Sequence, residues 1–106
     1  MLSVTLPDAG TAGCGSDLVL RRNIVICNAR GLHARAAAKF VKVANAYDAE
    51  IRVVKGETDV SGRSIMGLMM LAAGIGCEIE MRAEGPAAGS VLAALVDLID
   101  RKFDEE

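Results

Sequence analysis

The alternation of hydrophobic and polar residues along the chain predicts seven secondary-structure elements. Stretches that are rich in β-branched residues, or that alternate between apolar and polar residues, predict strands at 19–27, 51–55, 58–60 and 78–83. Apolar residues at helical spacing predict three helices: one from Ala34, a short one over 65–73, and a last one marked by apolar residues from Ala88 to Phe103. The predicted order is therefore β-α-β-β-α-β-α.

This order mixes strands and helices without a strict βαβ repeat, which favours an antiparallel sheet over a parallel one. We expect an α+β fold, an open-faced β-sandwich in which a four-stranded antiparallel sheet carries three helices on one face. Residues 1–17 are rich in Gly, Ala, Ser and Thr and show no periodicity, so we interpret them as a flexible N-terminal extension. The folded domain is expected over 18–106, a length typical of one domain.

Composition narrows the class of function. The net charge is −2 and the chain has one Tyr, two Phe and no Trp, whereas nucleic-acid-binding proteins usually need a basic surface and aromatic stacking platforms. The longest apolar stretch, 65–75, is too short to cross a membrane. We therefore expect a cytoplasmic protein that neither binds nucleic acid nor inserts into a membrane. So short a chain also favours a carrier, a binding module or a regulatory domain over an enzyme with a deep cleft.

The cysteines and the histidine argue against a metal centre. The three cysteines, at 14, 27 and 77, lack the spacing of a zinc site and cannot all pair in disulfides. Cys27 and Cys77 are expected to be buried as small apolar side chains within strands. A lone histidine cannot form a metal site, so we expect no metal and no cofactor.

One segment carries candidate chemistry. His33, the only histidine, lies where a turn gives way to the first predicted helix. The first amides of a helix lack internal partners and the helix dipole is positive there, so a phosphate on His33 would accept hydrogen bonds from the amides of Ala34, Arg35 and Ala36. Arg35 adds a guanidinium suited to phosphate oxygens. Imidazole is nucleophilic near neutral pH and forms a labile bond to phosphorus. From the histidine and the arginine alone, a histidine that caps the helix or faces solvent is the favoured interpretation.

Two longer motifs favour the phosphoryl site. Gly31-Leu32-His33-Ala34-Arg35 is followed by a second motif over 62–71, in which Ser64 lies 31 residues after the histidine. Inside the predicted order of elements, these motifs resemble the HPr family, the histidine-containing phosphocarriers of the bacterial phosphoenolpyruvate-dependent phosphotransferase system. The resemblance covers about residues 19–103. It departs at Ala36, where the family usually has a proline that stiffens the start of the helix.

The resemblance implies a stoichiometric phosphocarrier, not an enzyme. It implies that enzyme I phosphorylates His33 at Nδ1, that Arg35 assists at the phosphoryl site, and that an enzyme IIA-type acceptor removes the phosphate. A sugar-transport system and a nitrogen-type regulatory system both fit this role. The protein is expected to act as a monomer.

Ser64 precedes the second predicted helix, where its hydroxyl would cap a free amide. The resemblance implies that an HPr serine kinase/phosphorylase modifies this serine, and the alternative is an ordinary helix cap. In the family the first two helices form the docking face, and methionine suits surfaces that fit several partners. We therefore expect Ile65, Met66 and Met69 in the partner interface. Lys42 is expected to add positive charge towards acidic partners, or else to be an ordinary solvated lysine.

Two alternatives to the carrier remain open. A regulatory binding module, switched by phosphorylation of Ser64, would leave His33 without a role and would bind its partner equally well after His33→Ala. A small-molecule-binding α+β domain of similar topology would need a buried polar pocket, for which the sequence supplies few inward-facing polar residues.

Overall fold

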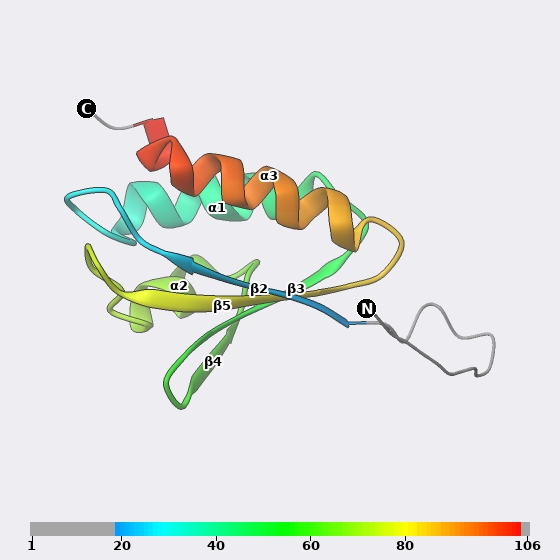
Figure 1. Ribbon diagram of the computed structural model, residues 1–106, viewed down its shortest axis with the longest axis horizontal. Coiled ribbons are helices and arrows are strands. Elements are labelled where there is room, and N and C mark those ends of the chain that lie inside the picture. Colours follow the sequence, from blue (N-terminus) through cyan, green and yellow to red (C-terminus); the bar gives the residue numbers. More distant parts are fainter. Residues whose placement is uncertain (1–18, 105–106) are drawn as a thin grey trace.

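The computed structural model describes residues 19–104 and shows one sheet covered by helices (Figure 1). The predicted extension at 1–17 lies outside the described residues. The strands are β2 (Val19–Val25), β3 (Glu50–Lys55), β4 (Thr58–Ser61) and β5 (Glu78–Glu84). The helices are α1 (Ala34–Asn45), α2 (Ile65–Met70) and α3 (Ala88–Asp100), followed by a short 3-10 turn, η3 (Lys102–Asp104).

The sheet is antiparallel throughout, with the spatial order β2-β5-β3-β4. β3 and β4 form the predicted hairpin, whose strands pair from Lys55 with Thr58 to Arg52 with Ser61. β5 lies between β2 and β3 although it follows both in sequence, and the helices make the connections that this crossover needs. The predicted α+β open-faced sandwich is thus confirmed.

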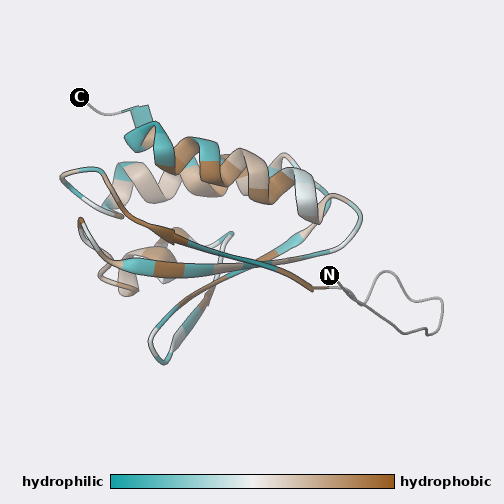
Figure 2. Cartoon of the chain, viewed as in Figure 1, coloured by the Kyte–Doolittle hydropathy of each residue, from teal (hydrophilic) through white to brown (hydrophobic). Residues whose placement is uncertain are grey.

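A single core lies between the sheet and the helices. β5 shows why: its inward residues Ile79 and Met81 are buried, whereas Glu80 and Arg82 lie on the opposite face and form an ion pair with an N–O distance of 2.7 Å. Because side chains alternate across a strand, one face of the sheet is apolar and the other polar. α3 is hydrophobic over most of its length, and polar residues become frequent only towards its C-terminal end (Figure 2). The largest fully buried side chains include Phe40, Phe103, Ile26, Ile51, Leu68, Ile79, Met81 and Leu95.

Two helices end earlier than predicted. α2 stops at Met70 instead of reaching residue 73, and Ala72 takes a left-handed conformation with φ of 53°. The early stop lets the Ala73 carbonyl accept a hydrogen bond from the Leu32 amide at 2.9 Å. α3 stops at Asp100, so Phe103 reaches the core from a left-handed turn (φ 55°) and not from the helix. In each case a contact distant in sequence outweighs the local helical pattern.

The prediction that Cys27 and Cys77 are buried in strands is wrong. β2 ends at Val25 and β5 begins at Glu78, so the cysteines lie just beyond the strand ends, where they are half-buried. The chain turns away from the sheet at this end, and the Cys27 thiol instead donates to the carbonyl of Ile99 at 3.2 Å.

Candidate functional site

His33 lies immediately before the first turn of α1, where it is the N-cap residue. Its backbone is extended (φ −81°, ψ −179°), and its carbonyl accepts the first hydrogen bond of the helix from the Ala37 amide at 2.8 Å. The side chain is half-buried and makes no capping hydrogen bond to the helix backbone. The imidazole therefore stands at the helix start without acting as its cap, and it is not enclosed in the core.

The turn before His33 is held against the loop that follows α2. Gly31 has φ of +66°, and an added Cβ would lie 2.4 Å from the Ala73 carbonyl oxygen, so only glycine fits here. The neighbouring Leu32 is buried, and its amide donates to that same carbonyl. Asn28 closes the turn from the other side, because its Nδ2 donates to the Gly31 carbonyl at 2.9 Å. Contacts on both sides thus set the direction in which the chain enters α1.

The opening turn of α1 offers backbone donors at the predicted place. Because the amide of Ala37 makes the first helical bond, the amides of Ala34, Arg35 and Ala36 lie before it. No acidic residue lies in this turn to oppose an anion, so the helix dipole favours negative charge beside His33. Arg35 is exposed in the same turn. The predicted phosphate-binding set is therefore contiguous in the structure, and its binding of phosphate stays a prediction.

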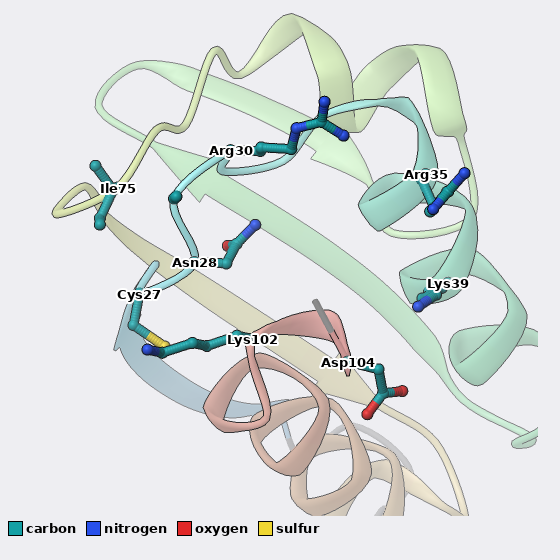
Figure 3. Close-up of a pocket in the computed structure, with 9 residues that line it drawn as sticks. Cys27, Asn28, Arg30, Arg35, Lys39, Ile75, Lys102 and Asp104 are labelled. Carbon is teal, nitrogen blue, oxygen red and sulfur yellow. The ribbon is translucent and has the colours of Figure 1, made fainter. Parts of the chain in front are cut away.

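An open hollow of about 600 Å³ adjoins this turn (Figure 3). Arg35 and Lys39, which are one helical turn apart, line it from α1, and His33 is not among its lining residues. The Lys39 ammonium donates to the Phe103 carbonyl at 2.7 Å and so ties α1 to the C-terminal turn. The hollow could not be predicted from the sequence, because its lining combines residues as far apart as Arg35 and Lys102.

Ser64 has the geometry of the predicted cap. It is the N-cap residue of α2, and its hydroxyl oxygen accepts a hydrogen bond from the Gly67 amide at 2.9 Å. The preceding Arg63 makes a contact that the sequence did not predict: its guanidinium donates to the carbonyls of Tyr47 and Ala49 at 3.3 and 2.6 Å. The start of α2 is thereby tied to the loop that follows α1.

The short helix α2 leaves apolar side chains on the surface. Leu68 is fully buried, whereas Ile65, Met66 and Met69 are 40%, 71% and 41% exposed. Met70, which was not predicted as an interface residue, is as exposed as Met66; its place in a run of methionines on a short helix was the available signal. α1 packs against α2. Lys42 is exposed in the last turn of α1.

Two absences within residues 19–104 bear on the class of protein. No three His, Cys, Asp or Glu side chains in this part of the chain are grouped so that they could hold a metal ion. None of the helices described there has the length and hydrophobicity needed to cross a membrane.

Fold and site together define a small open-faced α+β sandwich that presents a histidine at the start of its first helix. The family model described as "PTS HPr component phosphorylation site" matches residues 20–101. The chain therefore belongs to the HPr family, the phosphocarrier proteins of the phosphotransferase system.

Individual relatives agree with this assignment. The chain is 52% identical to "Phosphocarrier protein HPr" of Pseudomonas aeruginosa, over 77% of this chain and 92% of that protein. It is 46% identical to "Phosphocarrier protein NPr" of Shewanella violacea, over 81% of this chain and 94% of that one. The crystal structure of HPr-C-His from Thermoanaerobacter tengcongensis superimposes with a TM-score of 0.79 at 42% identity, covering 82% of this chain and 98% of the other.

Proposed function

We propose that this chain accepts a phosphoryl group from phosphorylated enzyme I on His33 and passes it to an enzyme IIA-type acceptor in the cytoplasm. The observation that carries the proposal is the position of the imidazole at the start of α1, beside three amides that precede the first helical hydrogen bond. Relatives named HPr and NPr match at 52% and 46% identity, so the proposal covers acceptors of the sugar-specific and of the nitrogen type.

The proposed step is a transfer between two nucleophiles. A ring nitrogen of His33, Nδ1 by resemblance to the family, attacks phosphorus, and the bond between phosphorus and enzyme I breaks as the new N–P bond forms. Arg35 and the amides of the first turn balance the charge on the phosphoryl oxygens. In the second step the acceptor attacks phosphorus, the N–P bond breaks, and the imidazole is regenerated. Each chain thus carries one phosphoryl group per cycle, as a stoichiometric carrier.

Labelling with phosphoenolpyruvate and enzyme I tests this assignment. We expect one phosphate per chain that is labile in acid and stable in alkali, and no label in His33→Ala. Arg35→Gln should slow labelling about tenfold, equivalent to about 1.4 kcal/mol of barrier. Arg21→Gln is the matched control, because Arg21 is an exposed arginine on β2, outside the site. No label on the wild-type chain, or equal labelling of His33→Ala, would overturn the proposal.

We also propose that Ser64 is a regulatory phosphorylation site for an HPr serine kinase/phosphorylase. Its support is the position of Ser64 at the N-terminus of α2, directly before the exposed side chains of Ile65, Met66 and Met69. A phosphate at a helix N-terminus is electrostatically tolerated, so α2 should persist while the partner-facing surface becomes negative. Such a phosphate would weaken binding to an acidic partner.

A kinase reaction with ATP separates this site from His33. Phosphoserine survives acid, unlike phosphohistidine, so the expected label is acid-stable and disappears in Ser64→Ala. Ser90→Ala is the control, because Ser90 is an exposed serine in the first turn of α3. An acid-stable label that persists in Ser64→Ala would place the modification elsewhere and defeat this part of the proposal.

We propose that the partner surface combines Ile65, Met66 and Met69 on α2 with Lys42 on α1, and that the free chain is a monomer. Met66→Lys should weaken binding of enzyme I while leaving the unfolding midpoint unchanged, because this side chain is 71% exposed. Val25→Lys is the control, since Val25 is an exposed apolar residue (51%) at the end of β2. Equal effects of the two variants on binding would argue against a specific surface on α2, and a dimer mass in light scattering would refute the monomer.

A further inference from the structure

The hollow beside the phosphoryl site is built by four segments of the chain (Figure 3). They are the loop after β2, the first two turns of α1, the loop before β5, which contributes Ile75, and the turn η3 after α3. Its volume of about 600 Å³ lies within the range of about 300–1,000 Å³ that is usual for small-molecule sites. The lining residues are Cys27, Asn28, Ala29, Arg30, Arg35, Lys39, Ile75, Lys102 and Asp104.

The charge of this lining is strongly positive, although the chain as a whole carries −2. Arg30, Arg35, Lys39 and Lys102 contribute four cationic groups, against one carboxylate from Asp104. That carboxylate is already engaged, because the guanidinium of Arg101 lies 2.6 Å from it. The field inside the hollow therefore favours an anion.

One of the four cations is held in place before any ligand arrives. The Lys39 ammonium is half-buried and donates one proton to the Phe103 carbonyl at 2.7 Å. An ammonium has three protons, so two remain to face a ligand. This bond reduces the entropy that Lys39 would lose on binding.

The cations are placed on opposite sides of the hollow. Figure 3 shows Arg30 and Arg35 on one side and Lys102 on the other, with Asn28 between them. Guanidinium groups match the oxygens of a phosphate in pairs, whereas an ammonium acts as a compact point charge. This arrangement fits a ligand that carries an anionic group at each end.

We propose that this hollow binds a small metabolite with two phosphate groups, and that the ligand shares Arg35 with the phosphoryl site. One phosphate lies against Arg30 and Arg35, and the other against Lys102 on the opposite side (Figure 3). A bound ligand then withdraws Arg35 from the incoming phosphoryl group and slows the labelling of His33. This last consequence rests on the proposed function, whereas the binding itself does not.

The shape and lining of the hollow favour a small molecule over a docked protein. The hollow is concave and polar, and the exposed methionines of α2 that suit a protein partner, Met66 and Met69, do not line it. Ile75 is the one large apolar residue in the lining and is 61% exposed. A protein partner would bury its apolar groups against α2 and reach this hollow only from its edge.

Calorimetric titration of the full chain at low ionic strength tests the binding. Glucose 1,6-bisphosphate is the probe and glucose 6-phosphate the comparison with one phosphate. We expect the bisphosphate to bind at least about tenfold more tightly, and Lys102→Gln and Arg30→Gln each to weaken it about tenfold, since each removes one charge-assisted bond. Lys55→Gln is the matched control, because it removes the same charge at the β3–β4 hairpin, outside the lining.

Several results would overturn the proposal. Equal affinity for the bisphosphate and the monophosphate would exclude recognition of two phosphates. An equal loss of affinity in Lys55→Gln would show only a general attraction between the chain and an anion. If millimolar bisphosphate gives neither heat nor a chemical-shift change, the hollow does not bind it and the proposal is wrong. The hollow would then be a surface that contacts carboxylates of a protein partner. The labelling rate of His33 is measured separately, with and without bisphosphate. If binding occurs but this ratio stays at one, the shared use of Arg35 is wrong.

Discussion

Gly31 tests how the site is held in place. The loss of stability on replacing it by alanine has two parts, the strain of a left-handed backbone and the close contact with Ala73. Gly31 and Gly56 have nearly the same left-handed backbone, with φ of 66° and 60°. A Cβ on Gly56 would meet nothing within 4 Å, whereas one on Gly31 would lie 2.4 Å from the Ala73 carbonyl oxygen and 2.7 Å from the Gly74 Cα. The variants Gly31→Ala and Gly56→Ala therefore share the conformational cost and differ in the close approach.

The expected magnitudes follow from these contacts. An alanine in the left-handed region costs about 1–2 kcal/mol, and the reduced freedom of the unfolded chain offsets about 0.4–1 kcal/mol of it. Gly56→Ala should therefore lose about 1 kcal/mol. In Gly31→Ala the backbone must also separate from Ala73, which breaks the 2.9 Å bond from the Leu32 amide. An unsatisfied buried donor costs about 1–3 kcal/mol more. The expected total loss for Gly31→Ala is therefore about 2–4 kcal/mol.

Urea unfolding followed by far-ultraviolet circular dichroism measures both losses, since the chain has no tryptophan. With m of about 1–3 kcal/mol per molar urea, the two midpoints should be clearly separated. Gly31→Ala should also slow labelling of His33, whereas Gly56→Ala should not. Equal losses of stability, within about 0.5 kcal/mol, would refute the reasoning that the site is held by close contact with the loop after α2.

Three further predictions concern the caps and the core. Ser64→Ala should lose about 1 kcal/mol in urea unfolding, and Ser64→Asp should regain most of it, because aspartate is an equally good N-cap; equal stability of all three chains would exclude a role for the cap. Phe103→Ala should lose about 3–5 kcal/mol, and a loss below 1 kcal/mol would show that η3 does not pack in the core. Ala36→Pro should change stability by less than about 1 kcal/mol, because residue 36 precedes the first helical hydrogen bond, yet it should alter the labelling rate of His33. A large loss of stability in Ala36→Pro would contradict this account of the first turn.

The elements that could be predicted from the sequence are those in which local pattern and burial coincide. The alternation in β5 gave its two faces, because Ile79 and Met81 contact the core while Glu80 and Arg82 pair with each other. The start of α1 was also predictable, since a turn sequence and a change of period meet at His33. A local motif thus located both His33, the proposed acceptor, and the helix that it precedes.

Contacts distant in sequence explain most of what was missed. Ala72 and Phe103 are non-glycine residues with φ of 53° and 55°, a conformation that local propensity disfavours. It is retained because Ala73 bonds Leu32 and because Phe103 fills the core while its carbonyl accepts from Lys39. Nothing in the neighbouring residues encodes these partners, which lie 41 and 64 positions away. The hollow beside α1 was missed for the same reason.

Ala36, in place of the proline usual in the family, exchanges rigidity of the first turn of α1 for an additional backbone donor. A proline at this position would remove one of the three amides that precede the first helical bond, while its ring would hold the turn rigid. Alanine keeps the third amide and leaves the turn freer, so under the proposed function the site has one more donor for phosphate and relies on other contacts for its rigidity. Those contacts are present: the Leu32 amide is bonded to Ala73, and Asn28 holds Gly31 at 2.9 Å. Because a carrier must release phosphate as readily as it accepts it, an additional donor is useful only where it does not bind the phosphoryl group too tightly. The geometry around Gly31 therefore bears on transfer as much as on folding.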